Sequence, residues 1–231
     1  MTQELLTFPL PLLTFTAAVV VVGCLGMLNS LLCAAGLASV PLATFDGAKK
    51  TVHRWTVEND PVMGGRSVSN WTLAKTATGE TVGEWRGSCR IVPSLHAPGF
   101  TIALTSNPFA SFPDVSSEDG LLLGMRNVPL PGGNVTKFQA AFCDSHIDIY
   151  RCQFASYKAA FTLPHSSTMQ EVFIPWSRFS DKWSAETGAH TKEDPPTSKT
   201  LKSISQLQLW VEGVEGDFHV WLHHVSAGKK R

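Results

Sequence analysis

Charged side chains are scarce in this sequence. Asp, Glu, Lys and Arg make up 16% of its 231 residues, against about 25% in an average soluble domain, and the 19 basic residues balance the 19 acidic ones. A nucleic-acid-binding domain normally carries a basic excess, so the composition excludes that class of partner. Intrinsic disorder is excluded as well, because seven Trp and thirteen Phe side chains need a hydrophobic core.

The scarcity is greatest near the N-terminus, where no charged residue occurs between Glu4 and Asp46. About 20 apolar residues span the hydrocarbon core of a bilayer, and a core helix of a soluble domain would need a polar face that this stretch lacks. We therefore interpret residues 10–43 as a targeting or membrane segment. The chain then divides into a signal peptide or membrane anchor at residues 1–45 and a folded β-sandwich domain at residues 46–231.

The sequence leaves open whether this segment is cleaved. A signal peptide should begin with basic residues, which are missing here, although the small residues at 33–35 and 36–38 suit a cleavage site. In an uncleaved anchor, the following Lys49, Lys50 and Arg54 favour a cytoplasmic domain. We expect a protein that is membrane-associated or that enters a secretory or organelle lumen.

Two features depend on that compartment. Asn70 and Asn134 each begin an Asn-Xaa-Thr sequon and are candidate N-glycosylation sites in a lumen. Cys143 and Cys152 bracket a polar stretch and are a candidate disulfide, which would stabilise the fold by roughly 2–3 kcal/mol in an oxidising compartment. The alternative is two buried thiols on adjacent strands.

No Cys-Xaa-Xaa-Cys pair occurs, so the sequence supports neither a zinc ribbon nor a thioredoxin-type site.

Catalytic motifs are also missing. The sequence has no Gly-Xaa-Ser-Xaa-Gly elbow, no P-loop and no dinucleotide-binding glycine motif. His219 and His223 have the spacing of a helical metal chelate, but their segment alternates like a strand, which would hold them roughly 13 Å apart. We therefore predict no enzyme activity, no cofactor and no metal site. The alternative left open is an enzyme on a jelly roll, such as a lyase or glycosidase, because catalytic residues can meet in the fold without a sequence motif.

Beyond the apolar segment, short alternating stretches separated by Gly and Pro predict β-strands. The predicted strands are Val82–Ile91, Lys137–Cys143, Ser156–Leu163, Met169–Pro175, Ser205–Val211 and Asp217–Val225. In the last of them Phe218, Val220 and Leu222 share one face. This pattern predicts an all-β fold, a jelly-roll β-sandwich. Residues 176–190 indicate a short turn of helix, and the polar stretch at 181–200 is expected to be an exposed excursion.

The most distinctive stretch is WTVENDPVMGGRSVS at residues 55–69. Asn and Asp before Pro form a strong turn, the paired glycines permit positive φ and close backbone approach, and Val-Met supplies an apolar tip. A loop of this kind either leads simply into a strand or contacts a partner. The predicted partner-binding loop consists of Asn59, Asp60, Val62, Met63, Gly64, Gly65 and Ser67.

The core of this stretch, NDPVMGGRS, resembles the Asp-Xaa-Val-Met-Gly-Gly-Xaa-Ser signature of the complex I intermediate-associated protein family. Weaker matches follow in the same order at Trp85–Gly87, Gly99–Phe100, Asp119–Leu121, Gly132–Phe138, Val172–Phe179 and Gly216–Phe218. The resemblance covers residues 51–227. It departs from the family at Pro98, where the family has the first Gly of a Gly-Gly-Phe segment.

The resemblance implies a galactose-binding-like jelly roll with a non-catalytic role. That role is assistance in the assembly of mitochondrial respiratory complex I, by holding membrane-arm intermediates, and it implies protein partners and a mitochondrial location. The alternative function is a carbohydrate-binding or glycan-binding β-sandwich module in a secretory or organelle lumen. The apolar leader and the two sequons fit that alternative.

Overall fold

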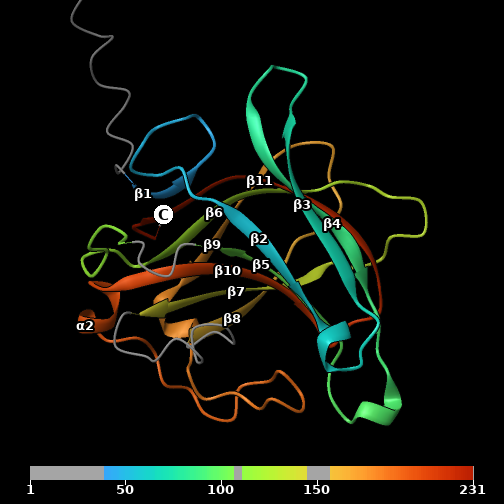
Figure 1. The fold of residues 1–231 in the computed structure, drawn as a ribbon. Helices are drawn as coiled ribbons and strands as arrows, with labels where there is room; N and C mark the ends of the chain where they lie inside the picture. Colours follow the sequence, from blue (N-terminus) through green and yellow to red (C-terminus); the bar gives the residue numbers. More distant parts are fainter. Residues whose placement is uncertain (1–38, 107–110, 145–156, 231) are drawn as a thin grey trace, which may run out of the picture. The chain divides into compact units, whose positions relative to one another are not determined.

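The fold is built from strands along which buried apolar and more exposed side chains alternate. The computed structural model describes residues 39–106, 111–144 and 157–230 (Figure 1). Phe218, Val220 and Leu222 are buried, while His219 and Trp221 between them are only half-buried. This strand therefore presents its apolar face to a core and its polar face outward.

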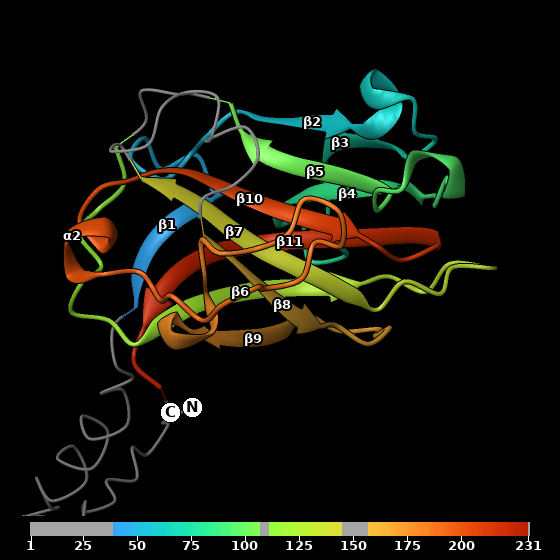
Figure 2. The same ribbon diagram turned by 90° about the horizontal axis from the view of Figure 1, so that it is seen from below.

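The strands form two antiparallel sheets (Figure 2). The six-stranded sheet has the order β3 (Val68–Lys75), β4 (Thr81–Cys89), β11 (Gly216–Gly228), β6 (Gly120–Asn127) and β9 (Gln170–Pro175), with β1 (Val40–Thr44) also paired to β11. The five-stranded sheet has the order β2 (Trp55–Asn59), β5 (Phe100–Thr105), β10 (Ile204–Glu212), β7 (Lys137–Asp144) and β8 (Tyr157–Thr162). The predicted all-β sandwich is confirmed, and each of the six predicted strands is present.

Aromatic rings from both sheets meet in the core. Phe218 of β11 makes an edge-on contact with Trp85 of β4 at a centroid distance of 4.7 Å, and with Phe138 of β7 at 6.4 Å. All three side chains are buried, and such ring pairs contribute about 0.5–1.5 kcal/mol beyond the burial of their area. They join one layer of the sandwich to the other.

The folded unit begins earlier than the sequence indicated. β1 pairs with the end of β11, and Leu42 and Ala43 are fully buried. Residues 40–45 therefore belong to the sandwich and not to the apolar segment. The sequence did not distinguish the two, because a short buried strand has no polar face and looks like a continuation of an apolar segment. The remainder of the predicted segment, residues 10–38, lies outside the described residues.

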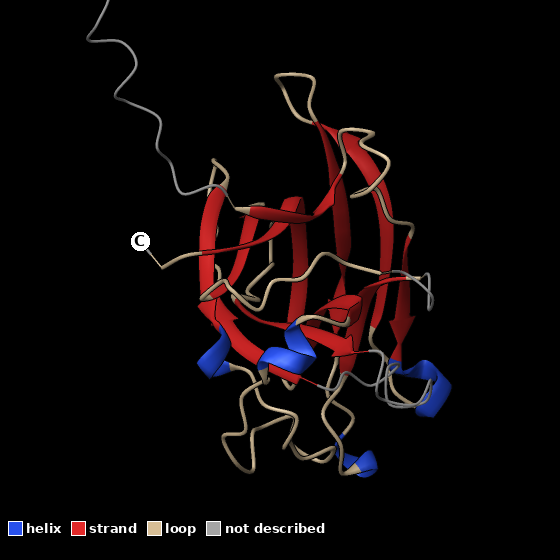
Figure 3. Ribbon diagram, turned by 90° about the vertical axis from the view of Figure 1, so that its left-hand side faces the viewer, coloured by secondary structure: helices blue, strands red, loops and turns tan. Residues whose placement is uncertain are grey.

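Helices are few and short (Figure 3). Among the described residues they are the 3₁₀ turns η1 (Asp60–Met63), η2 (Pro93–Leu95) and η3 (Trp176–Arg178) and the α-helix α2 (Ser198–Leu201). The turn η3 agrees with the helical turn expected within 176–190. In the part of the chain that the structure describes, no helix is long and apolar enough to cross a membrane.

Candidate functional site

The distinctive stretch forms a tight loop between β2 and β3. The chain leaves β2 at Asn59, makes the turn η1 and reverses at Gly64, whose φ of +87° favours glycine. The Gly65 N–H donates to the Asp60 carbonyl oxygen and closes the turn (3.0 Å). Pro is tolerated at the second position of η1, because an N–H in the first turn of a helix has no acceptor within the helix.

Asp60 fixes this loop from inside. Its side chain is buried at 3% exposure. One carboxylate oxygen accepts the Ser67 backbone N–H (2.7 Å), and the other accepts the Ser67 hydroxyl (2.7 Å) and the Phe100 N–H (3.0 Å). A buried carboxylate needs such donors, and each hydrogen bond to a charged group contributes about 1.5–3 kcal/mol. Asp60 thus ties the loop to the start of β5.

The paired glycines have different reasons to be glycine. Gly64 has the positive φ that the sequence predicted for the pair, whereas Gly65 does not. A Cβ on Gly65 would instead overlap the Asp60 carboxylate. Gly99 has a similar role, since a Cβ there would overlap the Arg90 carbonyl oxygen. Close packing around Asp60, and not only turn geometry, therefore dictates this part of the signature.

The remaining predicted loop residues divide between interior and surface. Asn59 is half-buried and its Oδ1 accepts the hydroxyls of Ser69 (3.0 Å) and Thr101 (2.7 Å). Ser67 is fully buried and donates to Asp60. Gly64 is exposed. The side chains of Val62 and Met63 lie outside what the structure describes. Asn59, Asp60 and Ser67 thus shape the loop from inside, whereas Gly64 lies at its surface.

Around the loop the molecule exposes apolar side chains. Val68 is 52% exposed, and Ile91 and Leu95 are each 41% exposed. Leu95 of η2 lies against Gly64, and Arg66, two positions further along the chain, is exposed. We refer to Gly64, Arg66, Val68, Ile91 and Leu95 as the signature-loop surface. Sequence reasoning missed Ile91 and Leu95, because only the folded chain brings η2 beside the loop.

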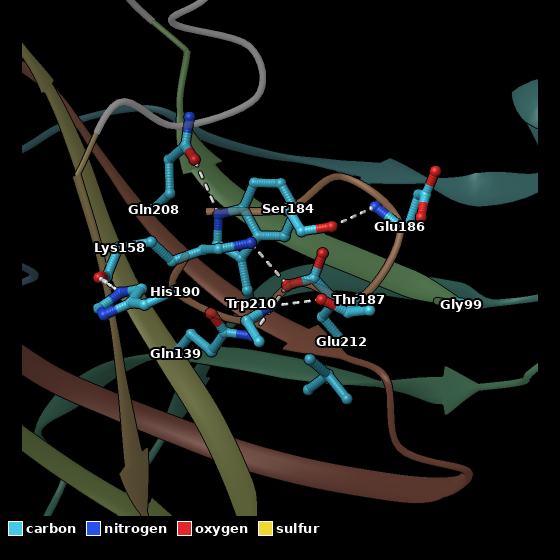
Figure 4. A network of polar contacts seen from close by, with 12 residues as sticks. Gly99, Gln139, Lys158, Ser184, Glu186, Thr187, His190, Gln208, Trp210 and Glu212 are labelled. Atoms are coloured by element: carbon cyan, nitrogen blue, oxygen red, sulfur yellow. Dashed lines mark hydrogen bonds and ion pairs between the residues drawn. The ribbon is translucent and has the colours of Figure 1, made fainter. Parts of the chain in front are cut away.

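A second polar site lies on the outer face of the five-stranded sheet (Figure 4). The Lys158 ammonium contacts the Glu212 carboxylate at 2.6 Å, and both side chains are nearly inaccessible, at 0% and 4% exposure. Gln139 donates to the same carboxylate oxygen (2.8 Å). The rings of Trp183 and Trp210 lie 3.8 and 4.5 Å from the ammonium, in cation–π geometry.

Residues 181–195, which we call the strap, cover this ion pair. His190 donates from Nε2 to the Lys158 carbonyl oxygen (2.6 Å), and Gly188 packs directly on the Glu212 carboxylate. Burial lowers the pKa of Lys158, and the attraction of Glu212 opposes that shift. Residues 181–200, predicted to be an exposed excursion, are exposed at many positions, but their buried residues pack against the sheet. No sequence signal links Lys158 to Glu212, which is far along the chain.

Other predicted residues lie apart from both sites. Asn70 and Asn134 are exposed, as glycosylation would require. Cys143 is buried in β7, and the predicted disulfide is outside the described residues because Cys152 is among those left out. Within the described ranges, no group of three or more His, Cys, Asp or Glu side chains surrounds a common point that could hold a metal ion.

Comparisons with known proteins bear on this architecture. A family model described as Complex I intermediate-associated protein 30 (CIA30) matches residues 43–222. A search of curated proteins found no match. The solution structure of CtCBM11 is similar, with a TM-score of 0.52 and 14% identity over 86% of this chain and 99% of that one.

A second similar structure is the Family 11 carbohydrate-binding module from Clostridium thermocellum in complex with a beta-1,3-1,4-mixed-linked tetrasaccharide. It has a TM-score of 0.51 and 14% identity over 84% of this chain and 98% of that one. At this identity the similarity shows the β-sandwich fold alone.

Proposed function

Because the chain belongs to the Complex I intermediate-associated protein 30 (CIA30) family, we propose that its β-sandwich is a non-catalytic binding domain that takes part in the assembly of respiratory complex I. The observation that carries the proposal is the family match across residues 43–222, which includes the signature loop. The proposal includes a jelly-roll, galactose-binding-like classification of the sandwich and a mitochondrial location.

The geometry of the loop supports a binding role. Asp60, with its three donors, holds the loop in one conformation before any partner arrives. A preorganised loop loses little conformational freedom on binding, which favours affinity. Leu95 packs against Gly64 of the loop, and Leu95, Ile91 and Arg66 are exposed. Apolar and Arg side chains of this kind are favoured in protein interfaces. We propose the signature-loop surface as the contact with a complex I assembly intermediate, with membrane-arm intermediates as the expected partners.

Glycan binding is the alternative that the sequence left open. The carbohydrate-binding modules support it only through the fold, because the identity of 14% carries no binding residue across. Binding of this chain to glycans therefore stays a prediction. Attachment to a membrane also stays a prediction, now through residues 10–38 because residues 40–43 belong to the sandwich.

Affinity purification of the full-length chain tests the proposed function. A tagged chain is extracted from its own cells in mild detergent, and the proteins that accompany it are identified by mass spectrometry. We expect complex I subunits and other assembly factors. The paired change Ile91→Asp and Leu95→Asp should reduce their recovery about tenfold or more, as the loss of a central apolar contact does. Leu73→Asp is the matched control, because Leu73 is even more exposed, at 64%, but is not part of the signature-loop surface.

Recovery of complex I subunits at wild-type level with the paired variant would contradict the proposed surface. Absence of complex I subunits from the wild-type purification, or a glycosylated lumenal product, would contradict the proposed function itself.

A further inference from the structure

A β-bulge in β11 brings two consecutive histidines together. In a regular strand, neighbouring side chains point to opposite faces. The pairing of β11 with β6 shifts register between Leu222 and His224, as a bulge does. As a result, the rings of His223 and His224 meet at 84°, and their Nδ1 atoms are hydrogen-bonded to each other at 3.0 Å. A metal ion bound to both nitrogens would replace the shared proton. The prediction of no metal site considered His219 and His223 on a regular strand and did not foresee this pair.

Both imidazoles line a hollow of about 550 Å³ that is formed by β1, the start of β4 and β11. Asp46 and Glu80 line the same hollow, and a Glu80 oxygen lies 3.9 Å from His223 Nε2. The side chains of His223 and Glu80 are 39% and 60% exposed, so solutes reach them from solvent. Two carboxylates in the lining repel anions and attract cations.

One buried polar group at this hollow lacks a partner. Ser226 lines the hollow and is 3% exposed, and its hydroxyl oxygen has no hydrogen-bond partner among the described residues. Buried hydroxyls are normally satisfied by protein, water or a ligand. This hydroxyl adds a buried polar group to the wall of the hollow.

The separation of the two nitrogens matches adjacent ligands of one metal ion. With metal–nitrogen bonds of about 2.0–2.1 Å, two Nδ1 atoms 3.0 Å apart subtend about 94° at the metal. That angle suits neighbouring positions of a square-planar or tetragonal site, which Cu²⁺ and Ni²⁺ prefer, and is narrower than the tetrahedral angle of Zn²⁺.

The surroundings also suit metal-bound imidazoles. When Nδ1 of His223 binds a metal, its ring proton resides on Nε2, and the Glu80 carboxylate, 3.9 Å away, would have to move closer to accept it. Metal-bound histidines typically have such an outer carboxylate. Gly124 of β6 leaves room for the ring of His224, because a Cβ at that position would overlap the imidazole.

We propose that His223 and His224 are the protein ligands of a site for a divalent transition-metal ion, with Cu²⁺ or Ni²⁺ favoured over Zn²⁺. Among the described residues no group of three His, Cys, Asp or Glu side chains could hold the ion together, although the Glu171 carboxylate acts electrostatically on His224. We therefore propose that water completes the coordination. The site is independent of the proposed role in complex I assembly.

Metal titration of the full-length chain in mild detergent, carrying a tag without histidines, tests the site. We expect one tightly bound Cu²⁺ per chain, with an electron paramagnetic resonance spectrum that shows coupling to two imidazole nitrogens. His223→Gln and His224→Gln should each weaken binding about tenfold or more, since even the loss of an outer-sphere partner has an effect of that size. His219→Gln is the matched control, because His219 lies on the same strand but bonds to Glu84 (2.7 Å).

Thermal unfolding with and without Cu²⁺ adds a readout that needs no variant. Binding to the folded chain alone should raise the wild-type Tm. Wild-type affinity in both His223→Gln and His224→Gln, or a wild-type spectrum without coupling to two nitrogens, would overturn the proposal.

Discussion

Asp60 and Gly65 act as a pair, although they are five positions apart. The Asp60 carboxylate occupies the space in which any other residue at position 65 would place its Cβ. The donors that hold the carboxylate come from Ser67 and Phe100. The Asp60 carboxylate therefore fits only because position 65 has no Cβ, which explains why the signature contains both residues.

Gly65→Ala should destabilise the fold by about 2–3 kcal/mol, because overpacking forces the carboxylate away from its donors. The same substitution in an Asp60→Ala background should cost much less, because the overlapping atoms are gone. Urea unfolding of the four proteins measures this coupling. Equal costs of Gly65→Ala in the two backgrounds would show that the overlap is not the reason for the glycine.

His53 is a second residue with a measurable consequence. Burial lowers its pKa, and the hydrogen bond with the Leu42 carbonyl oxygen (2.9 Å) partly opposes the shift. An unfolded His titrates near pH 6.5. Between the lowered folded pKa and 6.5, the unfolded chain binds more protons, so stability falls as the pH drops through this window.

For one histidine this loss is at most about 1.4 kcal/mol per pH unit. His53→Gln should therefore reduce the difference in unfolding free energy between pH 7.5 and pH 5.5. Urea unfolding at both pH values checks it, and contributions from other groups cancel in the comparison with wild type. An unchanged difference would mean that burial of His53 does not penalise its charged form.

At the scale of elements, the strap and the outer face of the five-stranded sheet depend on one ion pair. Lys158 and Glu212 neutralise each other in a site that excludes water. Removing one partner from such a pair costs far more than removing both, because a charge stays buried without its counterion.

Lys158→Met should destabilise the fold by about 3–5 kcal/mol. The double variant Lys158→Met, Glu212→Gln should recover most of that loss, since no buried charge is left. Chemical unfolding of both variants and wild type provides the numbers. A double variant no more stable than the single one would show that the strap needs the ion pair itself.

The elements also show where sequence reasoning succeeds. β11, which has one half-exposed face, alternates and was predicted. β1, β2, β3 and β6 were not among the six predicted strands. β5 was missed, because Ile102 and Leu104 on its outer face pack with Trp210 in a second apolar cluster, which removes the alternation. Asp60 was found through the signature, whereas its role as the centre of the loop was not. The contact of Lys158 with Glu212 and the meeting of His223 with His224 depend on strand pairing and a bulge, which no local pattern encodes.

At the scale of the whole molecule, two antiparallel sheets share one aromatic core and present a preorganised loop at its surface. The fold is common to modules with different ligands, so it does not identify a function by itself. The family match supports the proposed binding role, and the hydrogen bonds of Asp60 hold the base of the signature loop. The proposed role in complex I assembly is the central claim of this account.

Assembly of complex I in cells that lack this chain tests the claim most directly. Native gel electrophoresis of their mitochondria should show less mature complex I and more of its subcomplexes. The wild-type chain and Leu73→Asp should restore assembly, whereas the variant with both Ile91→Asp and Leu95→Asp should not. Normal levels of mature complex I in cells without the chain would contradict the account.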